Sequence, residues 1–219
     1  MKGRETKNKV AHGLDMLNLA MRPHFLMFLV ALTAGCAFGD ITVPMPQQGA
    51  TTGYSGGANR IVIVPTFVDK RLNQGRIGMK KNNYAMDTAN VFPVENINQW
   101  LGIRLGNELK AAGFRVDAKA DNNNSAKIQG FTHKLFIEPV VQWTTVDLET
   151  DLSVVIRVSR PDGLEAERRY FVKGLDQALV ALEDSFAASL RKASDELMKR
   201  VVADIINLLN RFPEPQVQP

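Results

Sequence analysis

The sequence predicts an α+β domain, in which a mostly antiparallel sheet carries two helices packed on one face. Two features support this prediction. Apolar and polar residues alternate through two long stretches, and apolar residues recur every three or four positions in two other segments. Alternation is typical of strands with one buried face, and the longer period is typical of helices with one buried side. Consecutive strands with separate helices indicate an α+β arrangement.

The domain is expected to span residues 60–212 and to begin with a strand at Ile61–Val64, an unbroken β-branched run. Residues 69–93 are polar and Asn-rich without a period, so they are predicted to form a long loop. A helix is expected from Val94 to Ala112, with Gly113 as its stop. Its apolar face comprises Val94, Ile97, Leu101, Leu105, Leu109 and Ala112, with Trp100 beside them.

The alternating stretches between residues 131 and 158 predict antiparallel strands with one wet face. A short strand over Phe114–Val116 precedes them, and the turn Pro161–Gly163 leads into a returning strand at Glu167–Lys173. The residues expected on the buried side of the first stretch are Phe131, His133, Leu135, Ile137, Val141 and Trp143. Those of the second are Val146, Leu148, Leu152, Val154, Ile156 and Val158, with Asp147, Glu149, Asp151, Ser153 and Arg157 opposite.

The last predicted element is a helix from Asp184 to Leu209, with acidic residues at its start and a proline-rich tail at 213–219. Its apolar stripe nearly follows a heptad, which would also suit a partner helix. Covering its own sheet is the favoured interpretation. The stripe comprises Phe186, Leu190, Ala193, Leu197, Val201, Ile205 and Leu208.

The net charge of +4 arises mainly from the N-terminal segment. Residues 1–35 hold five of the 27 Lys and Arg residues and two of the 23 acidic ones, which leaves 22 and 21 in the remainder. The remainder is therefore nearly neutral and shows no clustered basic face. This balance argues against nucleic-acid binding.

Residues 1–35 have the form of a secretory signal peptide. A short basic segment with Arg22 precedes the uncharged apolar stretch Phe25–Leu32, which is too short to span a bilayer. Met16 and Met21 are alternative starts, and Met21 gives the more compact signal. The alternative interpretation, a buried helix around a core cysteine, is disfavoured because the stretch is apolar on all sides.

Leu32-Thr33-Ala34-Gly35-Cys36 resembles the lipobox of bacterial prolipoproteins, except that Thr33 stands where leucine is commonest. The resemblance implies cleavage before Cys36 and acylation of its thiol. Cys36 is the only cysteine, so an intrachain disulfide, a redox pair and a cysteine-based zinc cluster are excluded. Residues 36–59, rich in Gly, Pro, Gln and Thr, are predicted to form a flexible tether.

Signatures of catalysis are sparse, and neither an enzyme nor a cofactor is predicted. His133 is the only histidine after the signal, and a hydrogen-bonded core or edge histidine is favoured over a ligand or base. Asp147, Glu149 and Asp151 fall on one face of one strand, where a solvated face is favoured over paired catalytic carboxylates. No phosphate-binding or nucleophile motif occurs in the sequence.

Taken together, these elements resemble the YajG-type lipoproteins of proteobacteria. The resemblance rests on Ile61–Arg71, the helix ending Glu108-Leu-Lys-Ala-Ala-Gly-Phe114, the alternating strands, and Tyr170 leading into Phe186–Ser189. The Asn-rich segment 79–90 and the long leader do not fit the pattern. The resemblance implies outer-membrane anchoring and supplies no catalytic residues.

The sequence therefore predicts a non-enzymatic envelope lipoprotein that faces the periplasm from the outer membrane and binds a protein partner or assembles with itself. Ala37 supports the outer membrane, since the enterobacterial retention signal is Asp at that place. The competing hypothesis is a carrier of a lipid or glycan, which requires an apolar cavity, and a hydrolase is a weaker third. The 69–93 segment is the expected contact region, through Asp69, Arg71, Arg76, Lys80, Lys81 and Tyr84.

Overall fold

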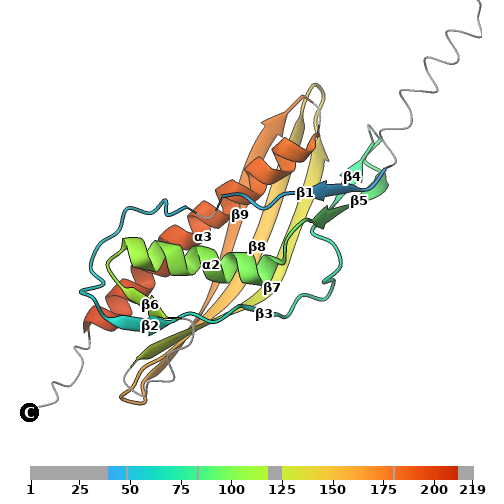
Figure 1. Ribbon diagram of the computed structural model, residues 1–219. Coiled ribbons are helices and arrows are strands. Elements are labelled where there is room, and N and C mark those ends of the chain that lie inside the picture. The colour runs from blue at the N-terminus through green and yellow to red at the C-terminus, as the bar shows by residue number, and fades with distance from the viewer. Residues whose placement is uncertain (1–38, 48, 83, 118–124, 180, 212–219) are drawn as a thin grey trace, which may run out of the picture. The chain divides into compact units, whose positions relative to one another are not determined.

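Three long strands form the framework of the fold (Figure 1). β7 (Ala126–Val141), β8 (Val146–Ser159) and β9 (Glu165–Ala178) pair as two consecutive antiparallel hairpins. The two alternating stretches thus form the paired strands that their period predicts. The computed structural model describes residues 39–47, 49–82, 84–117, 125–179 and 181–211. The predicted signal peptide, Cys36 and the 213–219 tail lie outside the described residues.

Shorter strands extend the sheet from the other edge of β7. Strands β2, β3 and β4 each pair with β7 in parallel, one after another along its length. Beyond them, β6 pairs with β2, while β5 joins β4 and β1 joins β5. The sheet is mostly antiparallel by length, with short parallel pairs. The short strands are β1 (Ile41–Val43), β2 (Ile61–Ile63), β3 (Val68–Asp69), β4 (Gly78–Lys81), β5 (Asp87–Pro93) and β6 (Arg115–Asp117).

Two helices, α2 (Ile97–Ala111) and α3 (Glu183–Arg211), lie in front of the long strands in Figure 1. The side chain of Asn96 accepts hydrogen bonds from the backbone N–H groups of Asn98 and Gln99, which fixes the start of α2. Val94 was expected in this helix but precedes the cap and is exposed. The predicted face is otherwise confirmed: the other residues assigned to it are buried.

The core lies between α3 and the long strands, and the two surfaces meet closely. Gly174 on β9 faces the α3 backbone so tightly that a Cβ there would lie 2.1 Å from the Ser189 carbonyl oxygen. The Ser189 hydroxyl is hydrogen-bonded to Thr150 at 2.6 Å and donates to the Leu148 carbonyl at 2.8 Å. Helix and sheet are therefore in direct backbone contact at this point.

The prediction of a long loop at residues 69–93 is wrong. This segment contains the end of β3 and the antiparallel hairpin of β4 and β5. The hairpin lacks a visible alternation because β4 is only four residues long and a bulge shifts the register at Lys80/Lys81. Short strands with mixed burial carry too little period to be recognised.

A bulge also corrects the predicted face of β7. The pairing of β7 with β8 shifts between Thr132 and Lys134, so His133 is the extra residue and is exposed. Before the bulge the buried residues are Ile128, Gly130 and Thr132, and Phe131 lies on the outer face. Trp143, also predicted inward, lies in the turn after β7 and is fully exposed.

Residues 40–59 pack on the domain and do not form the predicted flexible tether. β1 joins the sheet, and the segment that follows crosses α2, where Trp100 Nε1 donates to the Pro46 carbonyl at 2.8 Å. The Gly57 N–H donates to the Ala112 carbonyl at 2.8 Å. We call residues 44–47 and 49–59 the strap. Its composition suggested a linker, but side chains of α2 supply partners for its backbone.

The contact at Gly174 gives a first prediction. Gly174→Ala should lower the free energy of unfolding by about 2 kcal/mol or more, because the added methyl group overlaps backbone atoms of α3 that cannot move alone. Urea denaturation measures the change. Gly49→Ala is the matched control, since a Cβ at Gly49 has no neighbour within 4 Å. Equal stability of both variants would contradict the close contact.

Candidate functional site

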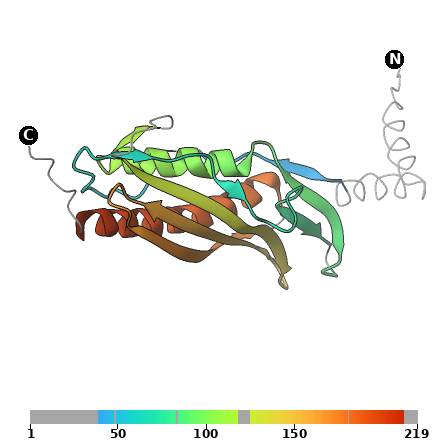
Figure 2. The same ribbon diagram turned by 90° about the horizontal axis from the view of Figure 1, so that it is seen from below.

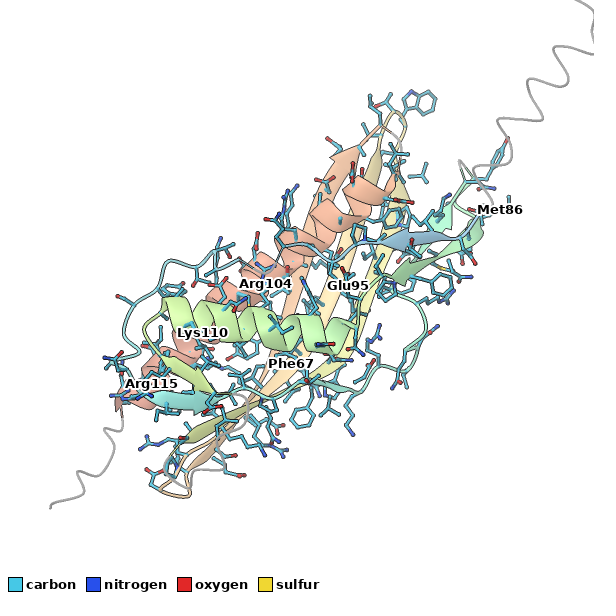
Figure 3. All side chains as sticks on the ribbon, viewed as in Figure 1. Phe67, Met86, Glu95, Arg104, Lys110 and Arg115 are labelled. Atoms are coloured by element: carbon cyan, nitrogen blue, oxygen red, sulfur yellow. The ribbon has the colours of Figure 1, made fainter. Side chains whose placement is uncertain are left out.

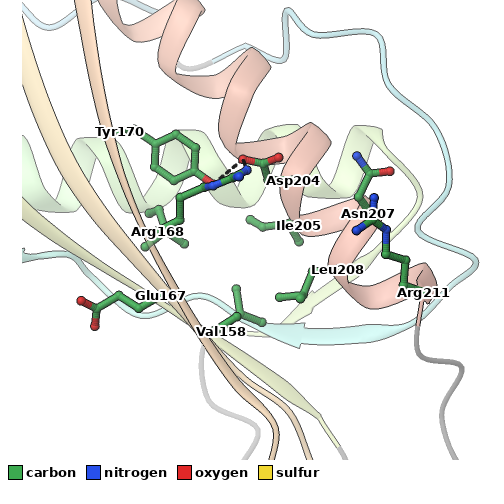
Figure 4. A pocket seen from close by; sticks show the side chains of 11 residues that line it. Val158, Glu167, Arg168, Tyr170, Asp204, Ile205, Asn207, Leu208 and Arg211 are labelled. Atoms are coloured by element: carbon green, nitrogen blue, oxygen red, sulfur yellow. Dashed lines mark hydrogen bonds and ion pairs between the residues drawn. The ribbon is translucent and has the colours of Figure 1, made fainter.

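A groove of about 470 Å³ opens between the C-terminal part of α3 and the adjoining ends of β8 and β9 (Figure 4). Ile156, Val158 and Ile205 are almost fully buried and belong to its floor. Leu208 is half-buried and leaves part of its side chain to the groove. The remaining lining residues are Ala166, Glu167, Arg168, Tyr170, Asn207, Asp204 and Arg211.

The spacing of residues along β9 and along α3 places these side chains in the groove. Arg168 and Tyr170 are two positions apart on β9, so both point toward α3. Asp204, Leu208 and Arg211 are four and three positions apart on α3, so they follow one side of the helix. The result is an apolar floor with a charged wall on each side.

Arg168, Tyr170 and Asp204 form a polar bridge across the groove wall. The Asp204 carboxylate accepts hydrogen bonds from the Tyr170 hydroxyl at 2.8 Å and from Arg168 Nη1 at 2.5 Å. Burial and the hydrogen bond to Asp204 raise the pKa of Tyr170 well above its usual value, and Asp204 also raises the pKa of Arg168. Tyr170 is therefore held neutral, as a hydrogen-bond donor that fixes the wall.

A second hollow, of about 550 Å³, lies on the other side of the same bridge and is predominantly basic. Arg200 pairs with Glu196, and Arg168 with Asp204. Among the described residues, the lining cation Lys199 has no ion-pair partner. Arg169 lies between Arg168 and Tyr170 on β9, so its side chain is directed to the other face of the sheet. The charge of Lys199 is thus available to an incoming carboxylate or phosphate group.

Two of the predicted contact residues, Asp69 and Arg71, are used inside the fold. Arg71 is buried and donates from Nη2 to the Asp69 carboxylate at 2.8 Å and to the Gln74 carbonyl at 3.0 Å. Burial alone would raise the pKa of Asp69, but the hydrogen bonds from Arg71 outweigh it and lower that pKa. This ion pair closes the turn between β3 and β4.

The other predicted contact residues lie on the β4–β5 hairpin and the segment before it. Arg76 donates to the Asn90 side chain at 2.9 Å, and Lys81 pairs with Glu138 on β7. Lys80 lies on β4, and Tyr84 in the hairpin turn is 83% exposed. The structure thus brings these residues to one hairpin, of which Tyr84 presents the largest free surface. Their contact with a partner stays a prediction.

Sequence reasoning missed two buried charges on α2, Arg104 (Figure 3) and Glu108. Arg104 donates to the Ser194 hydroxyl at 2.6 Å and pairs with Asp195 of α3. Glu108 accepts from the backbone N–H of Thr51 at 2.7 Å and from the Thr52 hydroxyl at 2.8 Å. Their four-residue spacing indicates that both lie on one side of the helix. The apolar period of the same helix explains its burial without them, so nothing in the sequence indicated that these charges lie inside.

The described residues include no group of three or more His, Cys, Asp or Glu side chains that could hold a metal ion. On the outer face of β8, Glu149 pairs with Lys173 at 3.1 Å and Asp151 with Lys134 at 2.7 Å. These carboxylates therefore form cross-strand ion pairs, in agreement with the predicted solvated face. In the described part of the chain, none of the helices has the length and apolar character needed to cross a bilayer.

Comparison with family models finds no match, and neither does comparison with curated sequences. Among solved structures, a protein from Xanthomonas campestris assigned to DUF330 is similar with a TM-score of 0.52 at 9% identity, covering 78% of this chain and 98% of that one. This similarity shows a shared fold. Lower similarities include a minor lipoprotein from Acinetobacter baumannii (TM-score 0.38, 16% identity, 52% of this chain and 86% of that one) and a lipoprotein from Neisseria meningitidis (0.30, 12%, 69% and 97%).

Tyr170 gives a prediction for alkaline pH. Its pKa in the native state is raised above the ordinary value of 10.0, so its contribution to stability is fully present below pH 10 and is lost as the pH rises further. Tyr170→Phe should cost about 1 kcal/mol at neutral pH through the lost hydrogen bond. The difference from the unmodified chain should shrink above pH 10.

Urea denaturation at a series of pH values measures this difference. Tyr84→Phe, at the exposed tyrosine, is the control and should run parallel to the unmodified chain throughout. A constant difference between the Tyr170→Phe variant and the unmodified chain across the alkaline range would show that the Tyr170 proton is not held by the fold.

Proposed function

We propose that this protein is a lipid-anchored, non-enzymatic envelope protein that binds a partner segment carrying both an apolar side chain and an acidic group in the α3–β9 groove. The observation that carries the proposal is the juxtaposition of an apolar floor with an unpaired cation. Leu208 and its neighbours offer apolar surface, and Lys199 of α3 lies beyond the Tyr170–Asp204 bridge. An apolar anchor with charges around it is typical of protein-binding surfaces.

The packing of α3 favours a protein binder over a carrier that encloses a lipid or glycan. A carrier needs an apolar cavity between helix and sheet. At Gly174 the α3 backbone touches the sheet, and the hydroxyls of Thr150 and Ser189 are joined across the same interface. This part of the interior is filled, so the groove at the surface is the better place for a ligand.

The anchor part of the proposal rests on the sequence. Leu32–Cys36 has the form of a lipobox, and the order of elements resembles the YajG-type lipoproteins. We assign Cys36 as the acylated residue. Ala37 in the next position favours transfer to the outer membrane, with the domain on its periplasmic face.

The anchor is tested by Cys36→Ser. The variant should no longer fractionate with the outer membrane and should accumulate as an unprocessed precursor, because the serine hydroxyl does not replace the thiol as acyl acceptor. Membrane fractionation and labelling with a radioactive fatty acid measure both effects. A serine variant that is processed and sediments with the outer membrane as before would overturn the assignment.

The groove is tested by site-specific photocrosslinking in cells, with a photoreactive amino acid at Asn207, an exposed position of the groove lining. A defined adduct is expected, and Leu208→Asp should abolish it by placing an unpaired charge against the apolar partner side chain. Lys199→Glu should weaken it by reversing an available charge. The same photoreactive group at Lys110, exposed on α2, is the control position and should give no such adduct.

Persistence of the Asn207 adduct in both variants would contradict binding in the groove. An adduct of twice the chain mass would show that the partner in the groove is a second copy of this chain and not another protein. The melting temperature of each variant is measured alongside, so that loss of an adduct through unfolding is recognised.

A further inference from the structure

The two hairpin turns and the end of β9 lie at one end of the sheet. β4 and β7 run in parallel, with Gly78 beside Ile137, so the β4–β5 turn and the β7–β8 turn point the same way. β9 ends there too, because Ala178 pairs with Val146 at the start of β8. Figure 2 shows both hairpins directed toward the side of the domain where β1 begins.

This end carries a concentration of exposed large hydrophobic side chains. Trp143 is fully exposed, Tyr84 is 83% exposed and Leu179 is 80% exposed. Figure 3 shows the labelled Met86 projecting from the β4–β5 hairpin. Six of the thirteen large exposed hydrophobic residues in the described part of the chain lie here: Tyr84, Met86, Val140, Trp143, Leu179 and Leu182. Single exposed apolar residues are common on protein surfaces, but a group of them at one place usually marks an interaction surface.

The N-terminal segment enters the domain at the same end. β1 is parallel to β5, with Ile41 beside Val91, and the Asn90 N–H donates to the Asp40 carboxylate at 2.6 Å. The chain before Asp40 therefore comes from the side of the β4–β5 turn. Cys36 lies four residues before Asp40, and a chain of that length spans about 14 Å at most.

We propose that this end is a membrane-contact surface, in which Trp143 and Tyr84 lie among the lipid headgroups of the bilayer that holds the acyl chains on Cys36. The proposal rests on the acylation of Cys36 argued above, since an anchor within about 14 Å of Asp40 brings this end to the bilayer. Tryptophan and tyrosine favour the membrane interface because they combine an apolar ring with a polar group. The neighbouring Leu179 and Leu182 add apolar surface.

Apolar contact dominates this surface, because the charged residues named around it are mostly acidic. Lys81 is paired with Glu138, and Asp87, Glu183 and Asp184 stand near the same end. A basic surface would bind anionic lipids through their charge, but this arrangement offers no net attraction to them. Contact should therefore depend little on the charge of the lipid.

The test uses the full acylated chain reconstituted in phosphatidylcholine vesicles, with and without bromine atoms high on the acyl chains. Bromine quenches tryptophan at short range. The chain has two tryptophans, and Trp100 is 2% exposed in the core, so it serves as an internal reference. Brominated lipid should quench the emission of Trp143 preferentially. In vesicles without bromine, that emission should be blue-shifted relative to the emission of the Cys36→Ser chain without residues 1–35 in detergent-free buffer.

Two variants complete the design. Trp143→Phe should lose the quenched component and leave the unquenched emission of Trp100. Trp143→Phe combined with Asn207→Trp moves the indole to the groove, about 33 Å along β9 from the contact end, and its emission should be insensitive to bromine. Adding phosphatidylglycerol to the vesicles should leave the quenching of Trp143 unchanged.

The outcomes separate this proposal from the one it rests on. If the Cys36→Ser chain without residues 1–35 binds vesicles as well as the acylated chain does, the anchor assignment fails. If the acylated chain is bound but Trp143 is unquenched, the membrane-contact surface alone is overturned. A blue-shifted but unquenched Trp143 would mean that protein, not lipid, covers this end, and quenching only with anionic lipid would overturn apolar contact.

Discussion

The hydrogen bonding of β7 along both of its edges is the constraint on which the rest of the fold depends. One edge pairs with β8 over almost its whole length, and the other receives β2, β3 and β4 in turn. Because side chains alternate, a shift of one residue would turn every buried residue of β7 outward. Gly130 fixes the position further, since the Phe67 ring lies against it where a Cβ would come within 2.4 Å.

The bulge at His133 follows from that double pairing. Thr132 must face inward, where its hydroxyl donates to the Asn98 side chain of α2 at 2.7 Å, and Leu135 must also face inward to reach the core. Two inward residues three positions apart cannot occur in a regular strand, so one residue has to be inserted. His133 is that residue, and its exposure is therefore a consequence of the sheet and carries no indication of catalysis.

A second constraint comes from the two charges on α2. Arg104 and Glu108 are buried, and leaving either without partners would cost several kcal/mol. Arg104 binds α3, and Glu108 binds the strap, so the two residues join three segments that are far apart in sequence. Burial alone would raise the pKa of Glu108, but the hydrogen bonds from Thr51 and Thr52 lower it, so it stays ionised and holds the strap.

The sequence predicts those parts of the fold whose elements are long enough to show a period. Both helices, the three long strands and most of the predicted core faces are confirmed, because burial of one side repeats over many residues. The short strands β4 and β5 and the packed strap could not be predicted. Their positions depend on β7 and on Glu108, which are remote in sequence and leave no local pattern.

The groove was equally inaccessible from the sequence. Tyr170 and Asp204 are 34 positions apart, and only the register of β9 against α3 brings them within 2.8 Å. Leu208 was assigned to the core stripe of the terminal helix, but Leu209 is the more deeply buried of the two. The period near a helix end is ambiguous by one residue, and here that single residue separates the core from the groove lining.

The packing of β1 and the strap limits how far the domain would lie from the proposed anchor on Cys36. A flexible tether over residues 36–59 would allow an end-to-end distance of about 27 Å and any orientation. With β1 fixed in the sheet, Cys36 stands four positions before Asp40, so the connection would be reduced to about 14 Å at full extension. Under the proposed anchoring, the distance of the groove from the bilayer would be set by the rigid strands and by α3, whose 29 residues span about 43 Å. A partner bound in the groove would then have to present its binding segment at a height above the membrane that the sheet determines.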